Sequence, residues 1–251
     1  MTDQQQPQEN DTIYRRMGQQ DILPNAVKYQ HLDTSIMGAD GWMDAQELWR
    51  YSSASGNAYT LTVPSDATLK YSIGDKVKLT QDNITTSYFY ITAVTSNSLT
   101  LNGGSGYSIT NKSINEAYYS KINTPLGFPQ WFNWSPTLSW DGTPPSSISS
   151  QTMRFNIIGR MLNFYYDIVY TNAGVNNQTL TITYMPVASK GTSGVYMYIG
   201  TGLMSTASDA TIPTDIRDYV TITESATPTL VQKTSGVLAI KSARASGFYE
   251  I

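Results

Sequence analysis

Few residues of this chain have side chains that could catalyse a reaction or bind a metal ion. Its 251 residues include no cysteine and one histidine, His31. The absence of cysteine excludes disulfides, thiolate metal sites and a cysteine nucleophile. A single histidine excludes a metal site built from two histidines of one chain. We therefore predict that His31 is a structural or interface residue and that the protein uses no cofactor.

Four carboxylates stand near one another in the sequence: Asp209, Asp215, Asp218 and Glu224. A close pair of carboxylates could hydrolyse a glycosidic bond, and several oxygens together could hold Ca²⁺. The spacing of a calcium-binding loop is absent, and no spacing here marks a catalytic pair. We predict solvated loop carboxylates, with a metal site and then catalysis as the alternatives.

Two glycine-rich stretches lack the context of a nucleotide-binding site. Residues 102–106 (NGGSG) are followed neither by Lys-Ser/Thr nor by a helix start, and residues 200–204 (GTGLM) stand among β patterns. The first stretch predicts a flexible hairpin or loop. Asp82 and Asn83 are likewise typical of a turn.

Charged residues are scarce and tyrosines are frequent. Charged residues make up 14% of the chain, the net charge is -3, and 18 residues are tyrosine. So few Lys and Arg residues do not suit binding to phosphate backbones, so we expect no nucleic-acid partner. The start, MTDQQQPQENDT, lacks the apolar core of a signal peptide, and no stretch approaches the ~18 apolar residues of a membrane helix. We expect synthesis in the cytoplasm and no membrane insertion.

Residues 53–120 alternate between apolar and polar with a period of two. Examples are YTLTV at 59–63, KVKLT at 76–80 and SYFYITAVT at 87–95. Short strands roughly every ten residues, separated by turn residues, are typical of antiparallel β structure. The segment therefore predicts a small β-barrel or sandwich domain.

Residues 1–52 predict a partly helical N-terminal arm. One helix is expected to start near Asp21 and to end at Gly38, and a second, short one is expected over residues 44–49. Since about 50 residues rarely build a core alone, the arm either forms a packed subdomain or docks into another protein. The docking hypothesis uses five apolar side chains: Leu32, Ile36, Trp42, Leu48 and Trp49.

Residues 121–145 predict an extended connector that is rich in proline and tryptophan. Proline fixes φ and removes a backbone donor, so a helix is excluded. Tryptophans in an ordered connector must pack on something, which is either the neighbouring domain or another copy of the chain. We assign the oligomer interface to four of its side chains: Trp131, Phe132, Trp134 and Trp140.

Residues 146–251 return to the β pattern without a helical stretch. Strands are expected over 152–158 and 161–170, joined by a hairpin at Gly159 and Arg160, and the chain ends on an apolar strand, GFYEI. Roughly eight strands in a hundred residues predict an antiparallel jelly-roll β-sandwich.

Three stretches carry a resemblance to a known group of proteins. They are YTLTVPSDATLKYSIGDKVKLTQ with YFYITAVTSNSLTLNGG, the connector YYSKINTPLGFPQWFNWSPTLSW, and MRFNIIGRMLNFYYDI with the final GFYEI. Together they resemble virion structural proteins of tailed bacteriophages, of the fibre, spike or receptor-binding type, over about residues 50–251. The resemblance implies a homotrimer with a C-terminal jelly roll, held on the particle by its N-terminal end. A surface poor in charge and rich in tyrosine suits burial against copies of itself.

Exposed tyrosines could also contact a sugar of the host surface. Tyr165 lies in an alternating run with aromatic neighbours, and Tyr196 and Tyr198 share one face of their expected strand. The same chemistry suits a trimer interface, so both roles remain open for these three residues.

The sequence thus predicts a non-enzymatic virion protein whose partners are its own copies, other tail or capsid proteins and a host glycan. Two alternatives remain: an architectural decoration or tail protein without a receptor, and a glycan-degrading spike enzyme, which needs a close carboxylate pair.

Overall fold

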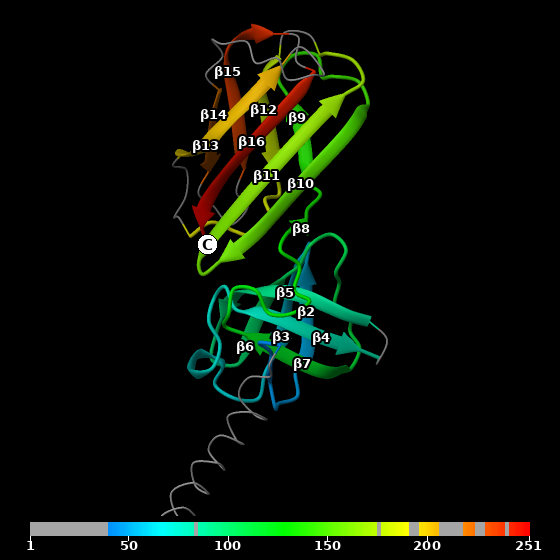
Figure 1. Cartoon of the computed structure of the whole chain (residues 1–251), viewed down its shortest axis with the longest axis vertical. Coiled ribbons are helices and arrows are strands. Elements are labelled where there is room, and N and C mark those ends of the chain that lie inside the picture. The colour runs from blue at the N-terminus through cyan, green and yellow to red at the C-terminus, as the bar shows by residue number, and fades with distance from the viewer. Residues whose placement is uncertain are drawn as a thin grey trace, which may run out of the picture.

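A computed structural model of the chain describes residues 40–82, 85–174, 177–190, 196–205, 218–223, 229–238 and 241–251. These residues form two antiparallel sheets that follow one another along the long axis of the molecule (Figure 1). The one helix in this part of the chain is a 3₁₀ turn, Ala67–Leu69, so no described helix could cross a membrane. The prediction of a mainly β fold is confirmed, and the first domain is an open sheet rather than a closed barrel.

The first sheet has seven strands in the order β1-β7-β4-β5-β6-β3-β2. Its core is built from the apolar residues of the alternating runs, such as Leu61, Val77, Phe89 and Leu101, which are fully buried. The strands are β1 (Met43–Asp44), β2 (Arg50–Ser55), β3 (Ala58–Thr62), β4 (Lys76–Gln81), β5 (Thr85–Val94), β6 (Ser98–Asn102) and β7 (Ile114–Ser120).

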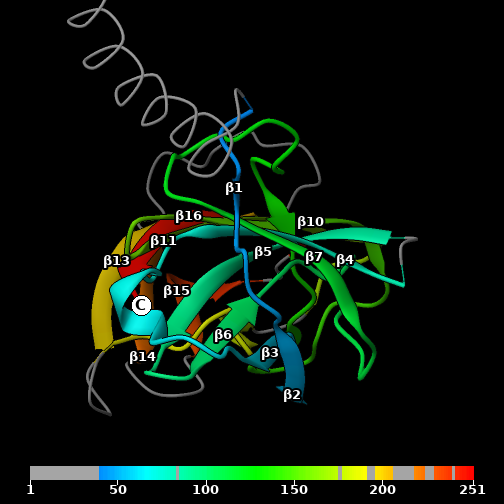
Figure 2. The same ribbon diagram turned by 90° about the horizontal axis from the view of Figure 1, so that it is seen from below.

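The segment from β1 to β2 crosses the first sheet from one edge to the other (Figure 2). Trp42 and Trp49 are 3% and 1% exposed, and Trp49 packs edge-on against Tyr71 at 5.6 Å between ring centroids. The helix predicted over residues 44–49 is therefore wrong, because apolar residues there complete the core of the first sheet. Residues 42–52, which we assigned to the attachment arm, belong to this sheet instead.

Two of the five side chains that we predicted to attach the arm to the particle are buried within the chain. Trp42 and Trp49 have no surface to offer a partner, whereas Leu48 is exposed. Leu32 and Ile36 lie outside the described residues, as do His31 and the helix expected from Asp21 to Gly38.

Glu47 is the polar centre of this crossing segment. Its carboxylate accepts hydrogen bonds from the Ser65 and Tyr71 hydroxyls and from the Trp49 indole, and the Lys70 amine lies 3.5 Å away. Burial raises the pKa of Glu47, but the three hydrogen bonds and the Lys70 charge outweigh burial. The net result is a pKa below the ordinary value of 4.5.

Replacing Glu47 with glutamine is expected to lower the free energy of unfolding at pH 7 by about 2 kcal/mol, because hydrogen bonds to a charged acceptor are lost. A pKa that is lowered in the folded state stabilises the protein above the unfolded pKa, and this contribution disappears as the pH falls through the folded value. The difference between wild type and Glu47→Gln should therefore shrink as the pH falls below 4.5.

Urea unfolding at a series of pH values measures this difference. Glu116→Gln serves as the control, since Glu116 is exposed and interacts with one hydroxyl, that of Thr80 at 3.3 Å. If the difference in unfolding free energy between wild type and Glu47→Gln stays constant as the pH falls below 4.5, the lowered pKa of Glu47 is contradicted.

The second sheet has nine strands in the order β8-β10-β11-β16-β13-β14-β15-β12-β9. The hairpin predicted at Gly159 and Arg160 is present, with Ile158 opposite Met161. The strands are β8 (Phe132–Asn133), β9 (Thr137–Trp140), β10 (Ile148–Ile158), β11 (Met161–Tyr170), β12 (Asn177–Thr183), β13 (Tyr196–Ser205), β14 (Asp218–Thr223), β15 (Leu230–Leu238) and β16 (Ser242–Glu250).

This sheet folds over on itself and encloses a second core. Every second residue of β11 is buried, from Leu162 to Tyr170. The Tyr166 hydroxyl on β11 donates to the Gln232 side chain on β15 at 2.5 Å, and the Trp140 indole on β9 donates to the Tyr170 hydroxyl at 3.0 Å. Strands far apart in the sheet order therefore face one another, while the jelly-roll connectivity stays a prediction.

An aromatic core joins the two sheets. It consists of Tyr90 on β5, Tyr107 after β6, Phe128 and Phe132 in the connector, and Phe155 on β10. The centroid of the Phe132 ring lies 5.2 to 5.7 Å from those of the other four. The segment that we predicted as a connector over residues 121–145 also supplies both edge strands, β8 and β9, of the second sheet, so this part of it belongs to that sheet.

The structure corrects the oligomer interface that we assigned to the connector. Phe132 and Trp134 are 1% and 3% exposed within the single chain, and Trp140 is half-buried against Tyr170. The neighbouring domains cover Phe132 and Trp134 almost fully and Trp140 in part. Trp131 is the most exposed of the four tryptophan and phenylalanine rings, at 38%.

Candidate binding cleft between the sheets

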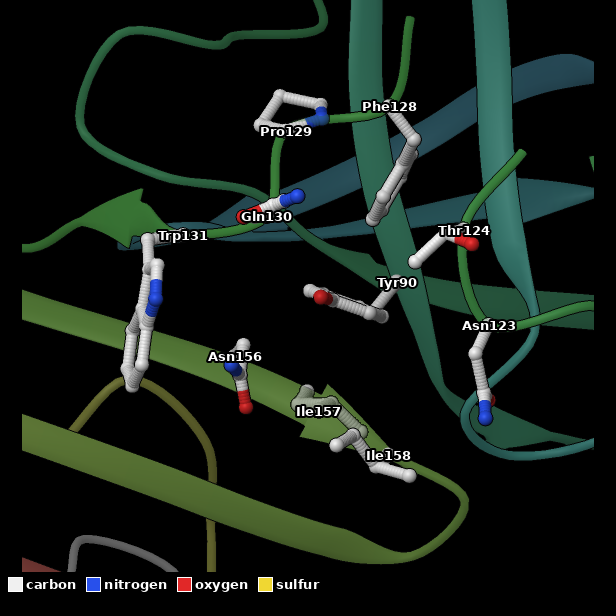
Figure 3. Close-up of a pocket in the computed structure, with 10 residues that line it drawn as sticks. All are labelled: Tyr90, Asn123, Thr124, Phe128, Pro129, Gln130, Trp131, Asn156, Ile157 and Ile158. Atoms are coloured by element: carbon white, nitrogen blue, oxygen red, sulfur yellow. The ribbon is translucent and has the colours of Figure 1, made fainter. Parts of the chain in front are cut away.

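A cleft of about 200 Å³ opens beside the aromatic core, where the first sheet, the connector and the end of β10 meet. Figure 3 shows Trp131 and Asn123 on opposite sides of it, with Tyr90 between them. Burial raises the pKa of Tyr90 to about 12, although a hydrogen bond with the backbone of Ile157 opposes this. The lining residues are Tyr90, Asn123, Thr124, Phe128, Pro129, Gln130, Trp131, Asn156, Ile157 and Ile158.

The polar side chains of this cleft are amides, the hydroxyls of Tyr90 and Thr124 and the indole of Trp131, and none of its lining side chains carries a charge. Asn123, Gln130 and Asn156 each offer both a donor and an acceptor, and Thr124 offers a hydroxyl. The Asn156 carbonyl oxygen accepts from the Asn163 amide at 3.0 Å, so the Asn156 amide nitrogen is left to donate elsewhere. Paired donors and acceptors beside aromatic rings suit a sugar, whose hydroxyls need both and whose ring has apolar faces.

The cleft has no group that could act as the acid or base of a glycosidase. Such an enzyme needs two carboxyl groups about 5 to 9.5 Å apart across the scissile bond. No Asp or Glu stands among the lining residues. The described lining of this cleft therefore does not supply the carboxylate pair of a glycosidase.

Arg154 holds Trp131 at the edge of the cleft. The guanidinium carbon lies 5.6 Å from the centroid of the Trp131 ring and 5.4 Å from that of Tyr165, which is directly opposite on β11. Cation–π contacts of this kind fix the orientation of both rings. In the described part of the chain Arg154 forms no ion pair, and its buried Nε has no hydrogen-bond partner.

The three tyrosines predicted to contact a glycan do not line this cleft. Tyr165 lies half-buried on the outer face of the second sheet, beside Arg154. Its neighbours across the strands are Ser246 and then Thr201 on β13. Tyr198 and Tyr196 stand three and five residues before Thr201, or roughly 10 and 16 Å along the strand at ~3.3 Å per residue. Their side chains lie outside the description.

Sequence reasoning missed the amides of this cleft. Asn123 and Gln130 come from an irregular segment, where no periodicity shows which way a side chain points. Arg154 and Asn156 had a usable signal, since both alternate with buried residues on the strand expected over 152–158 and must face outward.

The other candidate residues that we identified from the sequence are not among the residues that line this cleft. Asp209, Asp215 and Glu224 lie outside the described residues, and Asp218 begins β14 without a described side chain. Asp82 adopts a turn conformation with φ 53° and pairs with Lys112 at 2.6 Å. Within the described residues no three acidic or histidine side chains come together as a metal ion would need.

We predicted a flexible hairpin or loop at residues 102–106. The first two glycines of this stretch are instead closely surrounded by other atoms. A Cβ added at Gly103 would lie 2.8 Å from the Phe89 ring, and one at Gly104 would lie 2.9 Å from the Asn133 carbonyl oxygen. Gly103 therefore lets the chain pass close to Phe89 within the first sheet, and Gly104 lets the connector pack closely on that sheet.

No family model, no curated protein and no solved structure matches the chain.

Proposed function

We propose that the chain is a structural protein of a bacteriophage virion. In this proposal it forms a homotrimeric fibre or spike, is held on the particle by residues that precede Asp40, and contacts a glycan of the host surface. The observation that supports glycan contact is the uncharged cleft, where Trp131 stands among amide side chains. No catalytic step is part of the proposal.

Trimer formation is supported by composition and by the surface of the single chain. Only 14% of the residues are charged. Large apolar side chains, among them Leu126 and Phe248, remain exposed on the single chain. Exposed apolar side chains on a surface with few charges lose little solvation when copies pack together. Three copies would present three clefts, and simultaneous binding then gives avidity without tight single-site affinity.

Replacing Trp131 with alanine is expected to weaken glycan binding by about tenfold or more, because the loss of an aromatic anchor costs about 2 kcal/mol. The experiment applies the purified full chain to an array of bacterial surface polysaccharides and then measures the affinity for the polysaccharide that binds. The oligomer mass of each variant is determined alongside.

Leu69→Ala is the matched control, since Leu69 is an exposed apolar residue of the 3₁₀ turn and does not line the cleft. It should bind as the wild type does. Equal binding by Trp131→Ala and wild type would show that the cleft is not the site. If the wild type binds no polysaccharide, the purely architectural alternative replaces the receptor role.

A further inference from the structure

A second and larger cleft, of about 570 Å³, lies between the first sheet and the loop that follows β12. This volume is within the ~300–1,000 Å³ usual for ligand sites. Seven hydroxyl or amide side chains line it, and none of the lining residues is charged. They are those of Ser55, Asn57, Thr92, Thr100, Asn102, Ser135 and Tyr184; the lining also includes residues 185–188.

The walls of this cleft are tied together by Asn102, which is 4% exposed. In the amide orientation that satisfies both polar atoms, its nitrogen donates to the carbonyl oxygens of Asn57 and Pro186, each at 3.1 Å. Its oxygen accepts from the Thr92 hydroxyl at 2.8 Å. One buried side chain thus fixes the β2–β3 turn, β5 and the loop after β12 relative to one another, so the cleft is formed before any ligand arrives.

Tyr184 lines this cleft and has a backbone conformation that is unfavourable for a tyrosine. Its φ is 62°, in the left-handed region where glycine and asparagine are favoured, and its side chain is 67% exposed. No ring contact or hydrogen bond of this side chain is found among the described residues. Among the described residues, no such contact of the ring offsets the strain, and strained residues with exposed side chains are typical of binding sites.

We propose that this cleft binds a neutral saccharide, with the face of one sugar ring stacked on Tyr184 and its hydroxyls on the Ser, Thr and Asn side chains. An exposed aromatic ring supplies the apolar contact, and hydroxyls and amides supply paired donors and acceptors. The absence of charge in the lining argues against a phosphate or carboxylate ligand. The proposal rests on the proposed function for the class of ligand, and it places a second subsite on the same chain.

The test measures binding of neutral hexasaccharides of glucose, galactose, mannose and N-acetylglucosamine to the full chain by titration calorimetry. Tyr184→Asn removes the ring but suits the left-handed backbone, so its melting temperature should equal or exceed that of the wild type. It should bind at least tenfold more weakly. Tyr184→Phe keeps the ring and should stay within about threefold of the wild type.

The outcomes separate this inference from the proposed function. If Tyr184→Asn binds every hexasaccharide as the wild type does while Trp131→Ala loses polysaccharide binding, the inference is wrong and the proposed function stands. If the wild type binds neither hexasaccharides nor polysaccharides, both are wrong. A melting temperature of Tyr184→Asn well below that of the wild type would overturn the argument from strain.

Discussion

Replacing Phe132 with alanine is expected to lower the free energy of unfolding by about 3–5 kcal/mol. The ring is 1% exposed and lies between the sheets, where it contacts Tyr90, Tyr107, Phe128 and Phe155. Its removal leaves a cavity in the inter-sheet contact that neither sheet can close alone. The two sheets should therefore also unfold less cooperatively than in the wild type.

Urea unfolding followed by tryptophan fluorescence and by circular dichroism measures both effects. The control is Phe248→Ala, since Phe248 is 55% exposed and should change stability by less than about 1 kcal/mol. A similarly small change for Phe132→Ala would contradict the burial of this ring between the two sheets.

Replacing Gly74 with alanine is expected to destabilise the protein by about 2–5 kcal/mol, the sum of backbone strain and overpacking. Gly74 has φ 91°, and an added Cβ would lie 1.9 Å from the carbonyl oxygen of Gly159. Because Gly159 is in the turn between β10 and β11, the clash involves backbone that cannot rotate away. The sheets would have to separate at this contact, next to the cleft residue Ile158.

Gly56→Ala is a matched control for this substitution. Gly56 also has a positive φ, 58°, but an added Cβ there would meet no atom within 4 Å. It should cost only the backbone strain, about 1 kcal/mol. Thermal unfolding of the two variants gives the difference, and equal melting temperatures would contradict the close approach of Gly74 to Gly159.

The strands were largely predictable from the sequence because alternation is a local property. The run at 161–170 has the same bounds in the sequence and in the structure, since every second residue from Leu162 onward is apolar and buried. The hairpin at Gly159 followed from its turn residues. The C-terminal strand is longer than predicted, because the small residues Ala243 and Ala245 are buried without an obvious apolar pattern.

Which surface a buried side chain contacts could not be predicted. Trp42, Trp49, Phe132 and Trp134 all needed burial, and we assigned that burial to partner proteins. A tryptophan packs equally well on its own chain or on a second chain, so residue type does not distinguish the two. In the crossing segment from β1 to β2, residues of the same chain bury Trp42 and Trp49.

The candidate site was predictable only in part for a related reason. Trp131 was identified from the sequence, but for an oligomer interface rather than for a ligand, and Tyr165 does not line the cleft. The cleft itself combines Tyr90, Asn123 and Asn156, which are far apart in the sequence. Their meeting depends on the docking of the two sheets, and the contact of Gly74 with Gly159 that permits it has no signal in the sequence.

Competition with particle adsorption tests the central claim most directly. Host bacteria are saturated with the purified full chain before phage particles that carry this protein are added. The proposed function predicts that the wild-type chain binds the cells saturably and blocks adsorption, and that Trp131→Ala needs a concentration at least about tenfold higher to do either. A wild-type chain that fails to bind the cells, or that binds and leaves adsorption unchanged, would contradict it.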